Sequence, residues 1–244
     1  METHNLSKGK EMRVEELKNY GKPYSETMIS LPQPVQKLIK KESSRVVRRH
    51  LGILGSLRLL ILARRERNRL KEVDLTSVRE KGLTSELFID RTIQNTALFS
   101  ALAHIVGIER AGAIYYEIMD KVSKLMNEAI LPSVGELQGM ESDFKAFRDY
   151  LMAFFAAEKA AGLHDFEVAE DSDRAVALNV KYCAFCEIPR LCGIVEACDP
   201  SCYSDEVFFP GYLEPLGIRF VRTKTLARGG DCCDFRFEKV KPEA

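Results

Sequence analysis

The chain has 244 residues, of which 45% are hydrophobic and 30% are charged, and its formal net charge is zero. This length and composition are typical of a globular protein with a hydrophobic core. A net charge of zero argues against long-range attraction to nucleic acid, so we expect no nucleic-acid partner.

The first residues of the chain are polar and contain no apolar segment of the kind that directs secretion. The longest apolar run, Leu51 to Ala63, is interrupted by Arg58 and is too short to span a bilayer. We therefore expect a cytoplasmic protein without a transmembrane segment. In that compartment the seven cysteines are expected to stay reduced, as thiols, metal ligands or packing residues.

The order of apolar patterns along the chain predicts the fold class. Residues 1–33 are expected to form a polar, loosely held N-terminal arm. Residues 34–244 are predicted to form a single domain, with helices in 34–163 and a small antiparallel sheet with a β-hairpin in 164–244. Because helices come first and strands follow, the predicted class is α+β.

The first long helix is predicted over residues 35–70, where apolar residues recur three and four positions apart. Twelve Lys or Arg stand against two acids between Pro34 and Lys71. We interpret this segment as a core helix with solvated basic flanks, because apolar residues cover its middle too fully for a surface helix. The alternative is an interaction protein whose basic amphipathic helix binds a membrane or an acidic partner. The apolar positions of its middle include Leu54, Leu57, Leu60 and Ile61.

Three more helices are predicted, from Glu86 to Gly107, from there to Pro132, and from Met140 to Gly162. After Leu163 the apolar period changes from that of a helix to that of a strand.

One strand is predicted over Val176–Tyr182, followed by a short helix. Residues 199–217 are predicted to be a loop with one helical turn. Residues 218–227 and 233–240 are predicted to form the β-hairpin, joined by a glycine-containing turn.

All seven cysteines lie between Cys183 and Cys233, so we expect the chemistry of the protein in its last quarter. Two of them stand close to an acid in the sequence, Cys202 near Asp205 and Cys233 beside Asp234. Cysteine nucleophiles need a nearby cation or helix N-terminus to lower their pKa. The partner histidine stays open among His50, His104 and His164.

The alternative for the cysteines is a metal site. Zinc is the favoured ion, and Cys183, Cys198, Cys202 and Cys233 are the candidate ligands. Only Cys183 and Cys186 form the close pair that structural zinc sites usually show twice. For Cys186 and Cys192 we expect plain packing.

The C-terminal region resembles the L-2-amino-thiazoline-4-carboxylic acid hydrolase family over about residues 170–240. The resemblance is carried by a cysteine followed by an aspartate, a threonine at the end of a strand, a Gly-Asp turn and a Cys-Asp-Phe-Arg sequence. In this chain these are Cys202 and Asp205, Thr225, Gly230 and Asp231, and Cys233-Asp234-Phe235-Arg236.

The resemblance implies a hydrolase that opens a cyclic amidine, a small carboxylated molecule, at a C–N bond. It implies a catalytic group of Cys202, Asp205, Cys233 and Asp234. In this group Cys202, or a water oriented by Asp205, is the nucleophile, and Asp234 is the acid or base. Arg222, Thr225 and Gly230 would bind the substrate, with the Arg222 fork on the carboxylate.

A fainter resemblance is to vinyl-reductase-type ligand-binding domains, which end in a comparable hairpin. It implies a sensor that binds a small molecule or a metal without catalysis. Whether the chain forms a homo-oligomer stays open.

Overall fold

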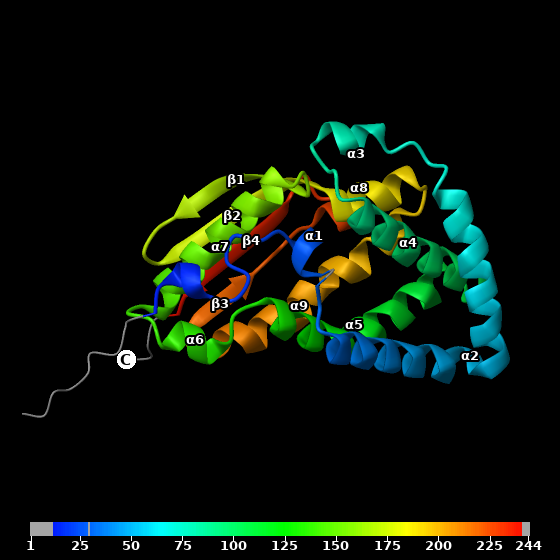
Figure 1. The fold of residues 1–244 in the computed structure, drawn as a ribbon, viewed down its shortest axis with the longest axis horizontal. Coiled ribbons are helices and arrows are strands. Elements are labelled where there is room, and N and C mark those ends of the chain that lie inside the picture. Colours follow the sequence, from blue (N-terminus) through cyan, green and yellow to red (C-terminus); the bar gives the residue numbers. More distant parts are fainter. Residues whose placement is uncertain (1–11, 29, 241–244) are drawn as a thin grey trace, which may run out of the picture.

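The computed structural model describes residues 12–28 and 30–240. In these residues a helical part is joined to a four-stranded antiparallel sheet, so the predicted α+β class is confirmed (Figure 1). The α-helices are α1 (Tyr24–Thr27), α2 (Gln33–Leu70), α3 (Thr76–Glu80), α4 (Glu86–Val106), α5 (Ile108–Ile130), α6 (Val134–Gln138), α7 (Asp143–Ala160), α8 (Ala184–Leu191) and α9 (Asp199–Leu213). Short 3-10 turns are η1 (Val14–Glu16), η2 (Val195–Ala197), η3 (Glu214–Leu216) and η4 (Leu226–Arg228).

The sheet has the strand order β1-β2-β4-β3. Its strands are β1 (His164–Asp171), β2 (Ala175–Cys183), β3 (Ile218–Val221) and β4 (Cys233–Lys239). One face is apolar and is covered by helices: Phe237 of β4 is fully buried between Phe147 of α7 and Phe209 of α9. The other face carries charged residues such as Arg236, which pairs with Glu170 of β1. This alternation makes the sheet two-sided, with one apolar face under the helices and one polar face.

The predicted helices after residue 85 agree closely with α4, α5 and α7. Ser85 begins α4 as its N-cap, since its hydroxyl oxygen accepts a hydrogen bond from the N–H of Phe88 at 3.4 Å. Gly107, at φ 86°, separates α4 from α5. In this part of the chain, capping residues were therefore sufficient to predict where the helices begin and end.

The loop predicted for residues 199–217 is wrong, because α9 runs through most of it. Its prolines are compatible with the helix, because Pro200 occupies the first helical turn, where a proline costs no hydrogen bond, and Pro210 lies in the last turn. Strand β1 was not predicted either.

The hairpin of β3 and β4 is present, but β3 ends at Val221, well before the predicted end of that strand. The carboxylate of Asp234 accepts hydrogen bonds from the N–H groups of Thr223 and Lys224, at 2.9 and 2.8 Å. These backbone N–H groups therefore form hydrogen bonds to a side chain instead of continuing the pairing of β3 with β4.

The loosely held arm is wrong for residues 12–28 and 30–33, which pack on the rest of the protein. Leu17 and Leu31 are buried, and the side-chain amide of Asn19 donates to the carbonyl of Ile130 at 2.8 Å. Residues 1–11 of the predicted arm lie outside the described residues.

Helix α2 bends sharply at Gly52, whose φ of 65° is left-handed, so that the helix forms an elbow at one corner of the molecule (Figure 1). The segment before the elbow lies along α5 and the segment after it lies along α4. The core-helix interpretation is wrong for the middle of α2. Ile53, Leu54, Leu57, Leu60 and Ile61 are all more than half exposed, and Leu54 reaches 82%.

A β-bulge in β2 decides which way the end of that strand faces. Phe166 of β1 pairs with Val180 of β2. The residue before Phe166 pairs with Tyr182, which leaves Lys181 as an extra residue. Because side chains alternate along a strand, the extra residue turns Cys183 to the same face as Val180. Cys183 thus points under the helices that cover the sheet.

Gly162 makes the turn between α7 and β1 and is predicted to be irreplaceable. It has a φ of 70°, and a Cβ atom there would lie 2.3 Å from the N atom of Leu83. We expect Gly162→Ala to lower the free energy of unfolding by about 3 kcal/mol or more, measured by urea denaturation.

Gly193 is the matched control, because it has a φ of 72° and no neighbouring atom within 4 Å of the position that a Cβ atom would take. Gly193→Ala should lower the free energy of unfolding only by the conformational strain of the alanine, about 1–2 kcal/mol. Equal losses in both variants would show that the close approach of Gly162 to Leu83 contributes nothing.

Candidate active site

Three side chains form a continuous row where α7, β1 and β2 meet. The Sγ atom of Cys183 lies 3.3 Å from Nε2 of His164. The Nδ1 atom of the same imidazole lies 2.8 Å from Oε2 of Glu158. A thiol, an imidazole and a carboxylate in this order are the components of a cysteine nucleophile with its base and the group that orients the base.

The local fold brings the three residues together from separate elements. Glu158 lies in the last turn of α7, and the turn at Gly162 then leads into His164, the first residue of β1. His164 and Cys183 are direct partners across β1 and β2. The bulge at Lys181 turns the thiol to the covered face, so the pairing also becomes a side-chain contact.

The row is buried and carries charge. The Glu158 side chain has no exposed surface, and that of His164 is 15% exposed. Burial alone would lower the pKa of His164, but the neighbouring Cys183 sulfur and Glu158 carboxylate outweigh it and raise that pKa to about 10. The imidazole is therefore protonated at neutral pH, and it places its positive charge next to Sγ of Cys183.

Aromatic rings and the segment of α1 enclose this row. The ring of Phe185 is stacked on His164 with centroids 6.0 Å apart, and Phe155 lies on the imidazole at the same distance. From α1, the N–H of Tyr24 donates a hydrogen bond to Oε1 of Glu158. The Tyr24 ring meets Phe185 edge to face. The N-terminal segment therefore covers the site.

A small surface pocket of about 210 Å³ reaches His164. It is lined by Lys81, Lys159, Gly162, His164, Asp165 and Tyr182. Lys159 pairs with Asp165 at 2.7 Å, whereas the ammonium of Lys81 lies over the Tyr182 ring, 5.6 Å from its centroid. Cys183 does not line this pocket, so His164 stands between the pocket and the thiol.

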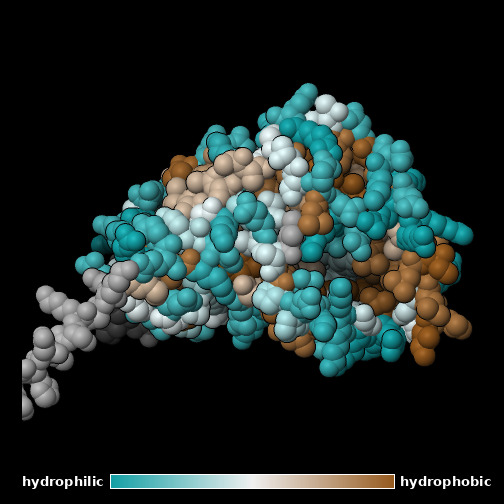
Figure 2. Space-filling view, viewed as in Figure 1, coloured by the Kyte–Doolittle hydropathy of each residue, from teal (hydrophilic) through white to brown (hydrophobic). Residues whose placement is uncertain are grey.

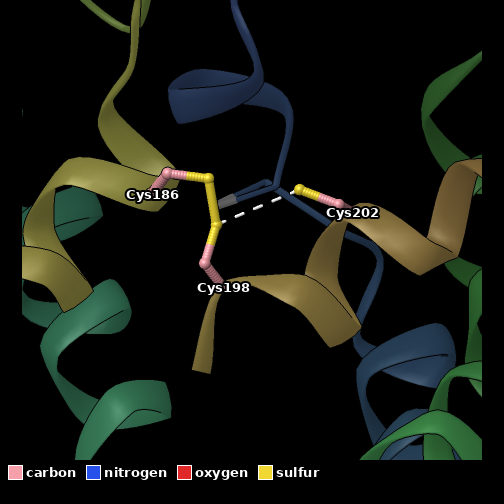
Figure 3. A group of neighbouring side chains, drawn as sticks. All are labelled: Cys186, Cys198 and Cys202. Carbon is pink, nitrogen blue, oxygen red and sulfur yellow. Dashed lines mark hydrogen bonds between the residues drawn. A yellow bond between two sulfur atoms is a disulfide. The ribbon is translucent and has the colours of Figure 1, made fainter. Parts of the chain in front are cut away.

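Two of the cysteines form a disulfide, Cys186–Cys198, which links α8 to the residue before α9. The prediction that all seven cysteines stay reduced is therefore wrong for this pair. The Sγ atom of Cys202 lies 4.0 Å from that of Cys198, one turn further along α9 (Figure 3).

The sulfurs of Cys186, Cys198 and Cys202 all lie within 4.8 Å of one another. This group differs from the predicted metal ligands, since Cys186 takes part and Cys183 and Cys233 do not. Cys186 is buried in the hydrophobic core, as expected, but its sulfur is also bonded to that of Cys198.

The predicted nucleophiles Cys202 and Cys233 lie near each other and near Cys183, but both are neutral thiols. Burial, with nearby Cys183 and Asp205, raises the pKa of Cys202 well above its ordinary value. Burial raises the pKa of Cys233 to about 11. Its sulfur accepts a hydrogen bond from the N–H of Leu226 at 3.2 Å. Of these three thiols, only Cys183 contacts a protonated imidazole.

Arg222, predicted to bind a substrate carboxylate, is already surrounded by acceptors inside the protein. Its side chain is 1% exposed and pairs with Asp205 at 2.7 Å and with Glu206 at 2.9 Å. It also donates to the carbonyl of Cys202 at 2.7 Å. Burial raises the pKa of Asp205 even though the guanidinium opposes this effect. The main contact of Arg222 thus ties the end of β3 to α9.

The remaining predicted site residues shape the loop between β3 and β4. Hydrogen bonds from Thr223 and Lys224 outweigh burial and hold the pKa of Asp234 below its usual range. The Thr225 hydroxyl accepts from the N–H of Arg228 at 3.2 Å. A Cβ atom on Gly230 would lie 2.9 Å from the carbonyl oxygen of Thr225.

Sequence reasoning left the histidine open and did not consider Glu158. The missed signal is the segment His164 to Val168, in which apolar and polar residues alternate directly after a helix-ending glycine. Recognising a strand there would have placed His164 beside the end of the predicted strand Val176–Tyr182.

Comparison with known proteins gives a family for the part of the chain that contains Glu158, His164 and Cys183. The family model described as L-2-amino-thiazoline-4-carboxylic acid hydrolase matches residues 87–237, more than half of the chain. This confirms the resemblance and extends it from the C-terminal segment into α4, α5 and α7. The chain is also 30% identical over 140 residues to the uncharacterized protein MJ0745 of Methanocaldococcus jannaschii, a match covering 56% of this chain and 71% of that protein.

The raised pKa of His164 is predicted to depend on Glu158. In Glu158→Gln the carboxylate charge is removed, so the imidazolium loses a favourable neighbour and its pKa should fall from about 10. NMR titration of the histidine ring signals measures this shift. The signals of His50 and His104 serve as internal controls. A His164 titration that is unchanged in Glu158→Gln would contradict the charge pairing.

Proposed function

The chain belongs to the L-2-amino-thiazoline-4-carboxylic acid hydrolase family, and on that premise we propose that it hydrolyses a small, carboxylated cyclic amidine with Cys183 as the nucleophile. The observation that carries the proposal is the contact of the Cys183 thiol with the protonated imidazole of His164. Cys202 and Cys233, the nucleophiles that the sequence suggested, have raised pKa values and no such partner.

In the first step the Cys183 thiolate adds to the amidine carbon of the substrate ring. The bond from this carbon to the ring nitrogen then breaks. The leaving nitrogen takes one proton from Nε2 of His164 and a second from the exocyclic amino group, which becomes an imine. The product of this step is a substrate chain linked to Cys183 through the former amidine carbon.

In the second step a water molecule adds to the same carbon. The now neutral His164 takes a proton from the water, and the carbon–sulfur bond to Cys183 breaks, which regenerates the thiolate and the imidazolium. The opened carbamoyl compound leaves. Glu158 holds the imidazole in place through both steps and balances its charge, as the carboxylate does in other nucleophile–histidine–acid sites.

We assign the substrate carboxylate to the pocket beside His164. Lys81 supplies positive charge there, since Lys159 is already paired with Asp165, and the pocket volume of about 210 Å³ suits a small molecule. Arg222 and Asp205 keep α9 against β3 in this proposal, with Cys202 and Cys233 as neutral walls of the site. Asp234, Thr225 and Gly230 contribute through the shape of their loop.

Replacement of Cys183 tests this mechanism directly. With 2-amino-thiazoline-4-carboxylate as substrate, Cys183→Ser should lower kcat/KM by about 10³-fold or more, because a serine hydroxyl is not ionised by an imidazolium. Product formation is followed by mass spectrometry, and thermal unfolding shows that the variant is folded.

Cys192→Ser and Cys202→Ser are the controls, the first at a buried cysteine of the helical core. Both should retain most of the wild-type activity. Full activity in Cys183→Ser together with loss of activity in Cys202→Ser would transfer the nucleophile to Cys202 and refute the proposal.

The second candidate function is a metal-binding sensor, and the group of Cys186, Cys198 and Cys202 favours it. Zinc–thiolate bonds of about 2.3 Å put neighbouring ligand sulfurs roughly 3.8 Å apart, and the Cys198–Cys202 separation is 4.0 Å. Reduction of the disulfide by a dithiol adds two electrons and two protons, and zinc binding would then release the thiol protons.

Under this second candidate, protein reduced by a dithiol should bind about one zinc ion per chain, measured by elemental analysis after removal of free metal. Cys198→Ser should abolish the binding, and Cys192→Ser should leave it unchanged. Reduced protein that takes up no zinc would exclude the metal sensor.

A further inference from the structure

The elbow of α2 exposes an apolar surface that the helical core does not use. The exposed side chains are Ile53, Leu54, Leu57, Leu60 and Ile61. Figure 2 shows hydrophobic side chains gathered over this corner of the molecule. Globular proteins rarely leave so many large aliphatic residues uncovered side by side, and such patches mark interaction surfaces.

The opposite side of the same helix already makes the contacts that hold it in place. Leu59 and Leu70 face the core, and Arg67 pairs with Asp90 of α4 at 2.6 Å. Before the elbow, His50 lies 2.8 Å from Glu117 of α5. The exposed residues are therefore surplus to the packing of α2. A helix that is apolar on both sides is expected to be covered on both.

Basic residues border the apolar surface on both sides of the elbow. Arg48 and Arg49 precede it, and Arg58, Arg64 and Arg65 follow, all exposed. Of these five, Arg49 pairs with Glu117 of α5. The other four form no ion pair with any residue in 12–28 or 30–240. An apolar centre with a rim of arginines has the chemistry of a segment that lies in a membrane interface.

We propose that the elbow of α2 docks the protein on an anionic lipid bilayer, with the apolar side chains between the headgroups and the arginines on lipid phosphates. The elbow protrudes as a corner, so it can enter a flat surface without any change in the fold (Figure 1). None of the helices in the described ranges has the length and hydropathy needed to cross a bilayer, and the contact is interfacial.

Charge decides between a bilayer and a second copy of this chain. In a symmetric dimer the same patch meets itself, which would bring the two arginine rims together. Like charges placed face to face oppose association. An anionic bilayer instead attracts the rim, and each arginine near such a surface strengthens binding about fivefold.

The proposal is tested by sedimentation of the whole protein with vesicles of phosphatidylcholine alone or with added phosphatidylserine. We expect binding to the anionic vesicles and weak binding to the neutral ones, with a decrease at high salt. Leu54→Gln combined with Leu57→Gln should abolish binding. Arg64→Gln and Arg65→Gln should each weaken it about fivefold.

Matched controls come from the turn and strand at the other end of the molecule. Val168→Gln removes an apolar residue that is also about half exposed, and Arg174→Gln removes an exposed arginine. Both should bind vesicles as the wild type does. Equal binding to neutral and anionic vesicles, or no binding to either, would overturn the proposal. So would a concentration-dependent dimer that Leu54→Gln with Leu57→Gln dissociates.

Discussion

The buried carboxylate of Glu158 is the group on which the arrangement of the site depends. A fully buried charge is tolerated only when it is paired and hydrogen-bonded, because it has lost its water. Glu158 meets this requirement with the imidazole of His164 on one oxygen and the N–H of Tyr24 on the other. One side chain therefore joins the end of α7, the start of β1 and the covering segment of α1. Without it the imidazolium would lose the carboxylate that it contacts directly.

Backbone geometry then brings one thiol, among several in the same region, into contact with an imidazole. Five cysteines are free in the described part of the chain. Only Cys183 ends a strand opposite a histidine, and only because the extra residue Lys181 turns it to the covered face. A strand without this bulge would point the thiol to the polar face, away from His164. The contact between Cys183 and His164 thus follows from the register of β1 and β2.

The sequence predicted what depends on local patterns and missed what depends on contacts between distant segments. The boundaries of α4 and α5 follow from Ser85 and Gly107, whose capping roles can be read from neighbouring residues. The family was also accessible from the sequence. The pairing of His164 with Cys183 was not, because it needs both strand β1 and the bulge. Helix α9 was missed as well, and its two prolines lie in its first and last turns, where a helix tolerates them better than in its middle.

Helix α2 shows why apolar periodicity cannot by itself identify a core helix. The spacing of apolar residues indicates how much of a helix surface is apolar. Burial depends on how many other helices and strands the fold packs against that surface. Helix α2 packs against neighbouring helices on one side only. Its segment before Gly52 contacts α5, and its segment after Gly52 contacts α4. The left-handed turn at Gly52 carries the second apolar side outward at the corner. Helix α1, which covers Glu158, ends at Thr27, and α2 begins at Gln33. The segment that covers the site is therefore close in the chain to the helix that bears the exposed apolar surface.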